Sequence, residues 1–365
     1  MGTGHLIYAN DGVLRAVPFD PATGQTTGIA APVEEGILTS ADGGAGFAVA
    51  RNGTLFYMSG KPAASDDLLV LVGRDGNEEP LALPGGVFFV GPRLSPDGTR
   101  VALNDVTTGD VEIRDLSREG VAKVTTSGAR DGAPLWTPEG NRIVFRSDRD
   151  DTLGLYMKPA DGTGVPVRLM EMRGATELKP MTWSQDAREL VFDYRESDTA
   201  SWNVGRVAMD GDGAWTPLLA TVANERNAAV SPASGFIAYQ SDLSGRPEVY
   251  LERFPALTDR QPVSTNGGIG PVWSHDGREL FFRDESGALL VAAVGRNGLE
   301  ESEPETIFDG SRRYAVGMGF ADRQYDVGPD GSFLFFKRRT ADTSGAQLIL
   351  VLNWLEELKR LVPTN

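Results

Sequence analysis

The stretch Leu94-Ser95-Pro96-Asp97-Gly98 is the first clear copy of a pattern that recurs along this chain of 365 residues. In each copy a Ser or Thr precedes a turn of the Pro-Asp-Gly kind, and an apolar strand follows. Pro fixes φ, Asp bonds to the backbone and Gly adopts a conformation that other residues resist, so the turn joins two antiparallel strands. The other close copies are Trp136-Thr137-Pro138-Glu139-Gly140, Trp183-Ser184-Gln185-Asp186-Ala187 and Trp273-Ser274-His275-Asp276-Gly277, and more divergent copies are Val230-Ser231-Pro232-Ala233-Ser234 and Val327-Gly328-Pro329-Asp330-Gly331.

The spacing of the copies indicates the architecture. Successive anchors from Ser95 to Gly328 are 42, 47, 47, 43 and 54 residues apart. Repeats of about this length that carry four short strands are typical of β-propeller blades. Strands rich in β-branched and aromatic residues follow the turns, as in Arg142-Ile143-Val144-Phe145 and Glu279-Leu280-Phe281-Phe282. The sequence therefore predicts an all-β protein, a single β-propeller of four-stranded antiparallel blades.

The number of blades depends on the N-terminal segment. A further copy at 47–57, with a turn one residue shorter, gives seven inner strands and favours seven blades. We expect the hairpin at 4–20 to close the ring by pairing with the last blade, because an open ring would expose two sheet edges. The propeller would then occupy residues 1–353. Eight blades result if the hairpin forms its own blade, and six if only the blades after Leu83 form the ring.

The C-terminal segment, 354–365, is expected to be a short helix with a tail. Trp354, Leu358 and Leu361 fall on one helical face. Acidic residues precede basic ones in this segment, which suits the helix dipole. We interpret the helix as a packed terminal cap on the ring, with a partner-binding helix as the alternative.

Composition limits the partners. The chain has 51 acidic and 35 basic residues, a formal net charge of −16, which repels the phosphates of nucleic acids and anionic membrane surfaces. The longest apolar run, 348–352, is too short to span a bilayer, so direct membrane insertion is not expected. Residues 1–11 lack the features of a secretory signal. With no Cys, the chain has neither a disulfide nor a thiolate nucleophile.

Candidate site residues come from the repeat. The loops that lead into the inner strands of a propeller line one mouth of its channel. Acids six or seven positions before an anchor should share this mouth, each next to a base. The acids are Asp131, Glu177, Glu225 and Asp322, and the bases are Arg130, Lys179, Arg226 and Arg323.

Two interpretations of these charges stay open. They can form ion pairs between blades, worth only ~0.2–1 kcal/mol each when exposed. Alternatively, the four carboxylates hold a hard cation, Ca²⁺ or Mg²⁺, which prefers oxygen ligands and needs no organic cofactor. Further acids after the second strands could add ligands or a general base, although turn caps are a simpler role. These acids are Asp148, Asp150, Asp193, Asp242 and Asp284.

Aromatic residues and His refine the picture. Trp136, Trp183 and Trp273 share one repeat position, so we expect them to pack between blades. Trp202 and Trp215 lie in polar loops, where packing and stacking on a ligand are both open. The chain has only two His, His5 and His275, so neither a His-rich metal site nor a Ser-His-Asp triad is expected.

These residues resemble a known family. The Trp-Ser-Pro-Asp-Gly turns, the Ser147-Asp148 and Ser241-Asp242 pairs and the outer turn Ala160-Asp161-Gly162 resemble TolB-like propeller repeats. The opening at 4–20 and the ending at 352–360 resemble the C-terminal propeller region of certain bacterial serine/threonine protein kinases. This resemblance covers nearly the whole chain and implies an extracytoplasmic sensory or interaction role. No kinase nucleotide loop, His-Arg-Asp loop or Asp-Phe-Gly motif matches, so the chain itself is not expected to be a kinase.

The sequence thus leaves more than one function open. The leading hypothesis is a sensor or interaction module that binds a small molecule or a protein at the channel mouth. The alternative is a divalent-metal-dependent hydrolase of phosphoesters or lactones at the same mouth, where the cation would polarise an oxygen and activate water. A scaffold in an envelope complex is a third possibility, and the fold alone does not choose among them.

Overall fold

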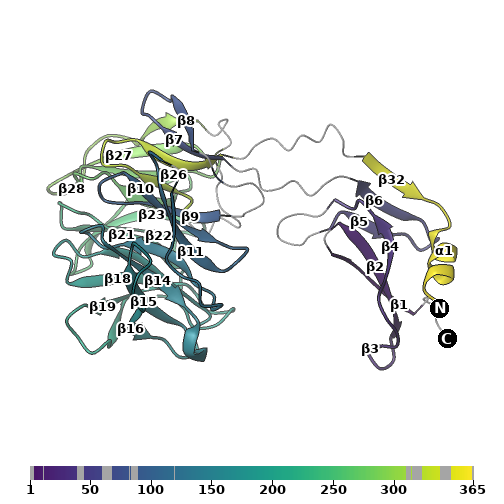
Figure 1. Cartoon of the computed structure of the whole chain (residues 1–365). Coiled ribbons are helices and arrows are strands. Elements are labelled where there is room, and N and C mark those ends of the chain that lie inside the picture. The colour runs from purple at the N-terminus through teal and green to yellow at the C-terminus, as the bar shows by residue number, and fades with distance from the viewer. Residues whose placement is uncertain are drawn as a thin grey trace. The chain divides into compact units, whose positions relative to one another are not determined.

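The computed structural model describes residues 4–10, 12–38, 45–59, 68–81, 83, 89–118, 120–309, 314, 323–337 and 347–363. The chain forms two compact units, one of residues 1–66 with 339–365 and the other of residues 67–338. Each unit has its own sheets (Figure 1). Each also has its own core of buried side chains.

Six antiparallel sheets make up the described part of the larger unit, five of them four-stranded and one with a fifth strand. A 3₁₀ turn, Arg149–Asp151, lies between the second and third strands of one sheet. In chain order the strands are β7 (Leu68–Val72), β8 (Glu78–Leu81), β9 (Phe89–Leu94), β10 (Arg100–Asp105), β11 (Asp110–Asp115), β12 (Val121–Lys123), β13 (Gly132–Trp136), β14 (Arg142–Ser147), β15 (Gly154–Pro159), β16 (Val167–Glu171), β17 (Glu177–Trp183), β18 (Glu189–Arg195), β19 (Asn203–Ala208), β20 (Trp215–Leu219), β21 (Glu225–Val230), β22 (Phe236–Ser241), β23 (Glu248–Arg253), β24 (Thr258–Pro262), β25 (Ile269–Trp273), β26 (Glu279–Arg283), β27 (Leu289–Gly295), β28 (Gly298–Leu299), β29 (Glu305–Phe308), β30 (Tyr325–Val327) and β31 (Phe333–Lys337).

The first strands of these sheets form a closed ring. Strands β9, β13, β17, β21, β25 and β30 contact one another in this order, and β30 contacts β9. The ring closes through a sheet in the order β30-β31-β7-β8, which joins the two ends of the unit. In it Phe333 lies opposite Val72, and Lys337 lies opposite Leu68. The predicted all-β propeller of four-stranded antiparallel blades is confirmed.

The closure differs from the expected one. The ring has six sheets among the described residues, the smaller number weighed above, and the repeat copy at 47–57 lies in the other unit. The N-terminal hairpin pairs with strands of its own unit, and 68–72 takes the place expected for it. The physical reason is the residue pattern: Leu69, Val70 and Val72 are buried, as a strand between packed sheets requires, whereas alternate residues of 5–10 are exposed.

The recurring turn and the recurring Trp have the predicted structural roles. The Ser95 hydroxyl donates to Asp97 and accepts from the Arg100 amide at 3.0 Å, and Gly98 has the positive φ of 71° that the turn needs. Each Trp links its sheet to another by a bond from Nε1 to a backbone oxygen. These bonds are Trp136 to Arg93 at 2.9 Å, Trp183 to Trp136 at 2.8 Å and Trp273 to Ala229 at 2.9 Å.

The core of the ring lies between neighbouring sheets. Phe281 of one sheet meets Phe333 of the closing sheet edge to face, with ring centroids 5.1 Å apart. Both side chains are fully buried. Interdigitating aromatic side chains of this kind contribute much of the stability of a core.

The described residues of the smaller unit form two sheets and a helix. Its elements are β1 (His5–Asn10), β2 (Val13–Asp20), β3 (Gln25–Thr26), β4 (Ala31–Glu35), β5 (Phe47–Val49), β6 (Leu55–Ser59), β32 (Gln347–Val351) and α1 (Trp354–Leu361). Strand β2 pairs with β1, β3 and β4, and β6 lies between β5 and β32.

The helix confirms the predicted apolar face in part. Trp354 and Leu358 are buried in a core with Leu14 and Leu55, whereas Leu361 is 40% exposed. Acidic residues occupy the first turn and basic residues the last, as predicted. His5 Nε2 lies 2.6 Å from the Val362 oxygen and so ties the first strand to the end of the helix. Among the described residues, no helix is long and apolar enough to cross a membrane.

Candidate functional site

The described residues of the predicted site lie at one end of the ring. We call this end the rim: the loops that lead into the first strand of each sheet, together with the loops between the second and third strands. Three backbone hydrogen bonds tie neighbouring sheets together here, and each donor lies six residues before a repeat anchor. They run from Asp131 N to Gly109 O at 2.7 Å, from Glu225 N to Trp202 O at 2.9 Å and from Gly268 N to Pro247 O at 3.0 Å.

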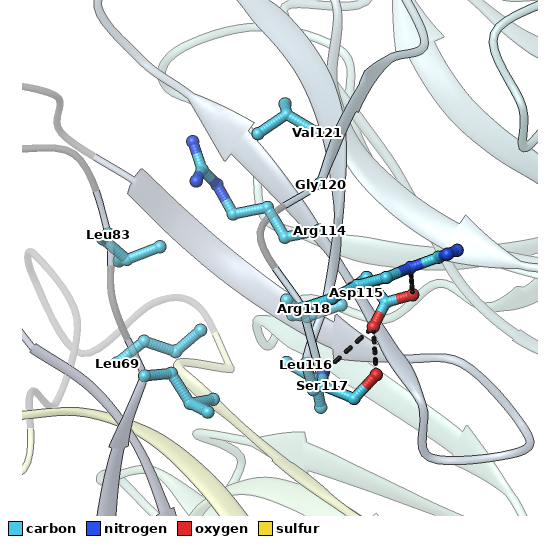
Figure 2. A pocket seen from close by; sticks show the side chains of 11 residues that line it. Leu69, Leu83, Arg114, Asp115, Leu116, Ser117, Arg118, Gly120 and Val121 are labelled. Carbon is cyan, nitrogen blue, oxygen red and sulfur yellow. Dashed lines mark hydrogen bonds and ion pairs between the residues drawn. The ribbon is translucent and has the colours of Figure 1, made fainter.

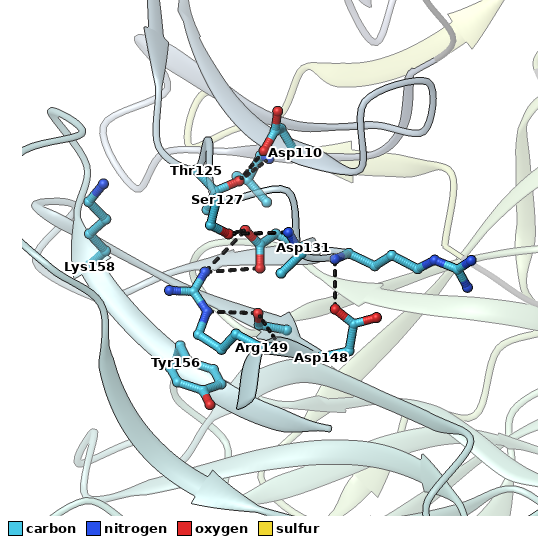
Figure 3. Close-up of polar contacts among 12 residues, drawn as sticks. Asp110, Thr125, Ser127, Asp131, Asp148, Arg149, Tyr156 and Lys158 are labelled. Carbon is cyan, nitrogen blue, oxygen red and sulfur yellow. Dashed lines mark hydrogen bonds and ion pairs between the residues drawn. The ribbon is translucent and has the colours of Figure 1, made fainter. Parts of the chain in front are cut away.

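The first corner of the rim is built around Asp131, and we call it the Asp131 corner (Figure 3). Arg149 Nη2 lies 3.0 and 3.1 Å from the two carboxylate oxygens of Asp131, whose side chain is fully buried. Ser127 donates to the same carboxylate at 3.3 Å. The guanidinium also lies 4.8 Å from the ring centroid of Tyr156. The carboxylate therefore has an internal cation as its partner.

The other predicted acids have separate partners. Glu177 Oε2 lies 3.0 Å from Arg146 Nη1, and both side chains are 28% exposed. Glu225 is buried and accepts hydrogen bonds from the hydroxyl and the backbone amide of Thr221. Asp322 lies outside the described residues. Each described carboxylate is thus held by its own neighbours, and no hydrogen bond or ion pair joins one described acid of the set to another.

These residues do not form a ligand set for a metal in the described part of the chain. Across that part, no group of three or more Asp, Glu or His side chains is arranged to hold an ion. Asp131 would have to release the Arg149 guanidinium, and Glu225 a hydroxyl, before either could bind a cation. A Ca²⁺ or Mg²⁺ site at the rim stays a prediction.

Most acids that follow the second strands take part in local hydrogen bonds. Asp148 accepts from the Arg130 amide at 2.8 Å, and Asp150 accepts from the Tyr156 hydroxyl at 3.3 Å. Asp284 accepts from the Ala288 amide at 2.9 Å. These contacts support the simpler interpretation of such acids as caps of loops.

Trp202 defines a second corner of the rim, which we call the Trp202 corner: Trp202, Lys179, Arg195, Arg226 and Asp193. Three cationic groups lie near the ring of Trp202, which is only 8% exposed. Lys179 Nζ is 4.8 Å from the ring centroid, Arg195 Cζ is 5.3 Å and Arg226 Cζ is 5.7 Å. Cations over an indole face are attracted by its quadrupole, so the ring holds their positions.

The loop that carries Trp202 is fixed to the next sheet. Asn224 Oδ1 accepts from the Trp202 amide at 3.1 Å, and Asn224 Nδ2 donates to Asp242 at 2.7 Å. The oxygen of Trp202 accepts from the Glu225 amide, as described above. Strands β18 and β21, from two sheets, thereby supply one preorganised arrangement of side chains.

Asp193 is the buried acid of this corner. It lies opposite Lys179 across the β17 and β18 pair, and its Oδ2 accepts from the Asn227 amide at 2.6 Å. Asn227 has a positive φ of 55° at a bulge in β21, which turns its amide away from the regular ladder. Burial raises the pKa of Asp193 to about 7, against the opposing effects of the Asn227 amide and the Lys179 charge.

The sequence analysis predicted that the acids of the rim lie close together. In the structure, two of the bases that accompany these acids lie close together instead. Lys179 and Arg226 share one repeat position, five residues before an anchor, and both meet at Trp202. Arg195, at the end of a second strand, was missed because nothing in the local pattern relates it to the other two. Trp215 packs against Phe192 and Tyr194, so the packing role holds for it.

A separate hollow of about 740 Å³ is lined by none of the residues of these corners, and Figure 2 shows the side chains that line it. Leu69 and Leu81 of the closing sheet line one part of it together with Leu83, and Leu116 and Val121 line another. Hydrogen bonds from Ser117 hold the pKa of the Asp115 carboxyl at about 2, which keeps this acid ionised beside Arg118. A substitution in this hollow therefore serves as a control for substitutions at the rim.

Comparisons of the sequence with known proteins give short matches only. No family model matches the chain. The chain is 28% identical over 112 residues to the Uncharacterized protein Atu1656 of Agrobacterium fabrum. It is 29% identical over 119 residues to the Uncharacterized peptidase YuxL of Bacillus subtilis. These matches cover 28% and 29% of this chain, and only 38% and 17% of the length of the two relatives.

Solved structures agree on the fold. A putative TolB from Agrobacterium tumefaciens superposes with a TM-score of 0.61 at 18% identity, covering 75% of this chain and 99% of that one. TolB from Acinetobacter baumannii gives 0.50 at 15% identity, over 83% and 80%. A puromycin-hydrolyzing peptidase of Mycobacterium tuberculosis gives 0.50 at 14%, over 77% and 47%. At such identities the likeness shows the fold alone: the chain contains a β-propeller similar to that of TolB.

Proposed function

We propose that the chain is a ligand-binding β-propeller, a sensory or interaction module whose ligand sits at the Trp202 corner of the rim. The observation that supports this most is the gathering of three cationic side chains around one buried indole, on loops fixed between two sheets. The indole face and the fixed loops hold these side chains in place, and a preorganised set of this kind favours binding.

The role proposed is binding of a small molecule or a protein, in line with the resemblance to TolB-like repeats and to propeller regions of receptor kinases. The strong negative charge of the chain makes nucleic acid an unsuitable partner. No contact of the described residues favours a metal-dependent hydrolase, because Asp131 is bonded to Arg149 and Glu225 is bonded to Thr221.

A thermal-shift screen with a chemically diverse panel of small molecules and peptides tests this function. A ligand at 100 times its Kd stabilises the folded state by about 2.7 kcal/mol. We expect hits whose shift is lost in Arg195→Met and kept in Arg118→Met, a matched change in the hollow of Figure 2. Hits that depend on Arg118 and not on Arg195 would contradict the proposal.

The same screen tests whether Ca²⁺ or Mg²⁺ binds at the rim. It is repeated with added Ca²⁺ or Mg²⁺ and with a chelator, using wild type and an Asp131→Ala, Glu225→Ala double variant. We expect the difference in thermal stability between wild type and the double variant to be the same with Ca²⁺, with Mg²⁺ and with the chelator. A cation-dependent shift that only wild type shows would favour the metal site over our interpretation.

A further inference from the structure

A further hollow, of about 500 Å³, lies between the loop that joins β22 to β23 and the segment that follows β24. Arg246 and Glu248 line it on one side, and Ser264 and Thr265 line it on the other. It is lined by none of the residues of the two corners described above. Its volume is within the range of about 300–1,000 Å³ that is usual for small-molecule sites. We call it the Arg246 hollow.

Hydrogen bonds within the protein fix the walls of the Arg246 hollow. The carboxylate of Glu248, whose side chain is only 4% exposed, accepts from the Ser264 hydroxyl and from the Gly267 amide at 3.0 Å. It also accepts from Arg246 Nε at 2.8 Å, and the same guanidinium donates to the Thr265 oxygen. One buried acid therefore joins the two segments that line the hollow, and a ligand finds it preformed.

The charged groups of the hollow compensate each other. Among the described residues that line it, Arg246 is the only cation and Glu248 the only carboxylate. Because these two form an ion pair, an ionic ligand would gain little net attraction there and would lose part of its hydration. An uncharged ligand does not have this cost.

The groups that can bond to a ligand here are two hydroxyls and one amino group. Tyr250, which is half-buried, and Thr265, which is exposed, line the hollow, and neither hydroxyl bonds to a described residue. Arg246 Nη1 also bonds to no described residue, and its side chain is 44% exposed. A hydroxyl donates and accepts, whereas a guanidinium only donates. The rings of Tyr250 and Pro262 add apolar surface to the same hollow.

We propose that the Arg246 hollow binds a neutral sugar. The hydroxyls of a sugar can both donate to and accept from Tyr250 and Thr265, and its oxygens can accept from Arg246. Its C–H faces match the apolar rings of the hollow, and a mixture of apolar surface with a few fixed polar groups is usual in small-molecule sites. This ligand site shares no residue with the Trp202 corner and goes beyond the function proposed above.

Glucose, N-acetylglucosamine, maltose and cellobiose are the probes for the test. The full chain carries fluorotyrosine, which gives up to eight ¹⁹F signals, and Tyr250→Phe identifies the signal of Tyr250. We expect a saturable shift of this signal with at least one of the four sugars. Glucuronate and glucosamine add one negative or one positive charge to a similar ring, and both should bind more weakly than glucose.

Two variants, studied by titration calorimetry of the unlabelled protein, test the contacts. Thr265→Val removes a hydroxyl from an exposed side chain of the same shape, so the variant should fold as wild type does. It should weaken binding of the best sugar about two- to tenfold, as expected for the loss of one hydrogen bond. Tyr8→Phe is the matched control, because it removes a phenol hydroxyl from β1 in the other unit and should leave the affinity unchanged.

Three results would overturn the inference. The first is the absence of a saturable Tyr250 shift with all four sugars. The second is an affinity that Thr265→Val and Tyr250→Phe both leave unchanged. The third is tighter binding of glucuronate or glucosamine than of glucose, which would show that the hollow selects a charge. None of these results depends on Arg195, so the proposed function at the Trp202 corner is tested separately.

Discussion

The Asp131 corner and the Trp202 corner occupy equivalent places in the ring but use charge in opposite ways. In both, an amide six residues before the anchor donates to the loop of the preceding sheet. At the Asp131 corner a buried carboxylate holds Arg149 with two contacts. At the Trp202 corner the cations gather on an indole while the buried acid is only partly ionised. The same backbone hydrogen bond therefore supports a buried ion pair at one corner and a group of cations over an indole at the other.

Breaking the Asp131 corner should have the largest effect on stability. Asp131→Ala leaves Arg149, only 18% exposed, without its carboxylate. Removing one partner of a buried pair costs about 3–5 kcal/mol of the free energy of unfolding. Urea denaturation measures this loss, which should be the same with and without Ca²⁺. A loss below about 1 kcal/mol would mean that Asp131 and Arg149 do not form a buried ion pair that stabilises the fold.

The pH dependence of stability should distinguish the buried acid of the Trp202 corner. The pKa of Asp193 is about 7 in the folded protein, above its ordinary value of 3.8, so the folded state binds the proton more tightly. Its contribution to stability is present below about pH 4 and is lost as the pH rises through 7. The stability of Asp193→Asn relative to wild type should therefore increase over this range, by up to roughly 4 kcal/mol. Urea titrations at pH 4.5, 6 and 8 check this, and a constant difference would contradict it.

Loosening the loop of the Trp202 corner should cost less. Asn224→Ala removes the acceptor of the Trp202 amide and a donor to Asp242. We expect a loss of about 1–3 kcal/mol, since a buried amide is left without its partner. Thermal unfolding measures the loss. Increased hydrogen exchange should be confined to the loop before β19, and exchange spread over the whole ring would argue against a local role.

The smallest effect is expected at Glu177. Its pair with Arg146 is partly exposed on both sides, so Glu177→Gln should cost about 0.2–1 kcal/mol and less at high salt. Chemical denaturation at 0.05 and 1 M NaCl measures this. A loss as large as that of Asp131→Ala would show that the exposed fraction of the side chains does not explain the different effects of the two substitutions on stability.

The sequence predicted the repeat, the turns and the packing role of the recurring Trp, because these depend on local conformation and on a period that is visible in the residues. It did not predict the closure at 68–72, since the choice of a closing strand depends on which face each strand buries in three dimensions. Asp131, Glu177 and Glu225 lie at the start of the first strands of three neighbouring sheets, as the repeat predicts, and their role as a site stays a prediction. The grouping of Lys179, Arg195 and Arg226 was missed, because it arises from two sheets and a loop whose conformation is fixed by Asn224.

Whether the Trp202 corner is a binding site is tested most directly by a crystal structure of the chain with a hit from the thermal-shift screen. We predict that the ligand lies beside Trp202 and contacts Arg195. The ligand should be absent from crystals of the Arg195→Met variant. A ligand bound only elsewhere on the surface, with this corner empty, would contradict the account.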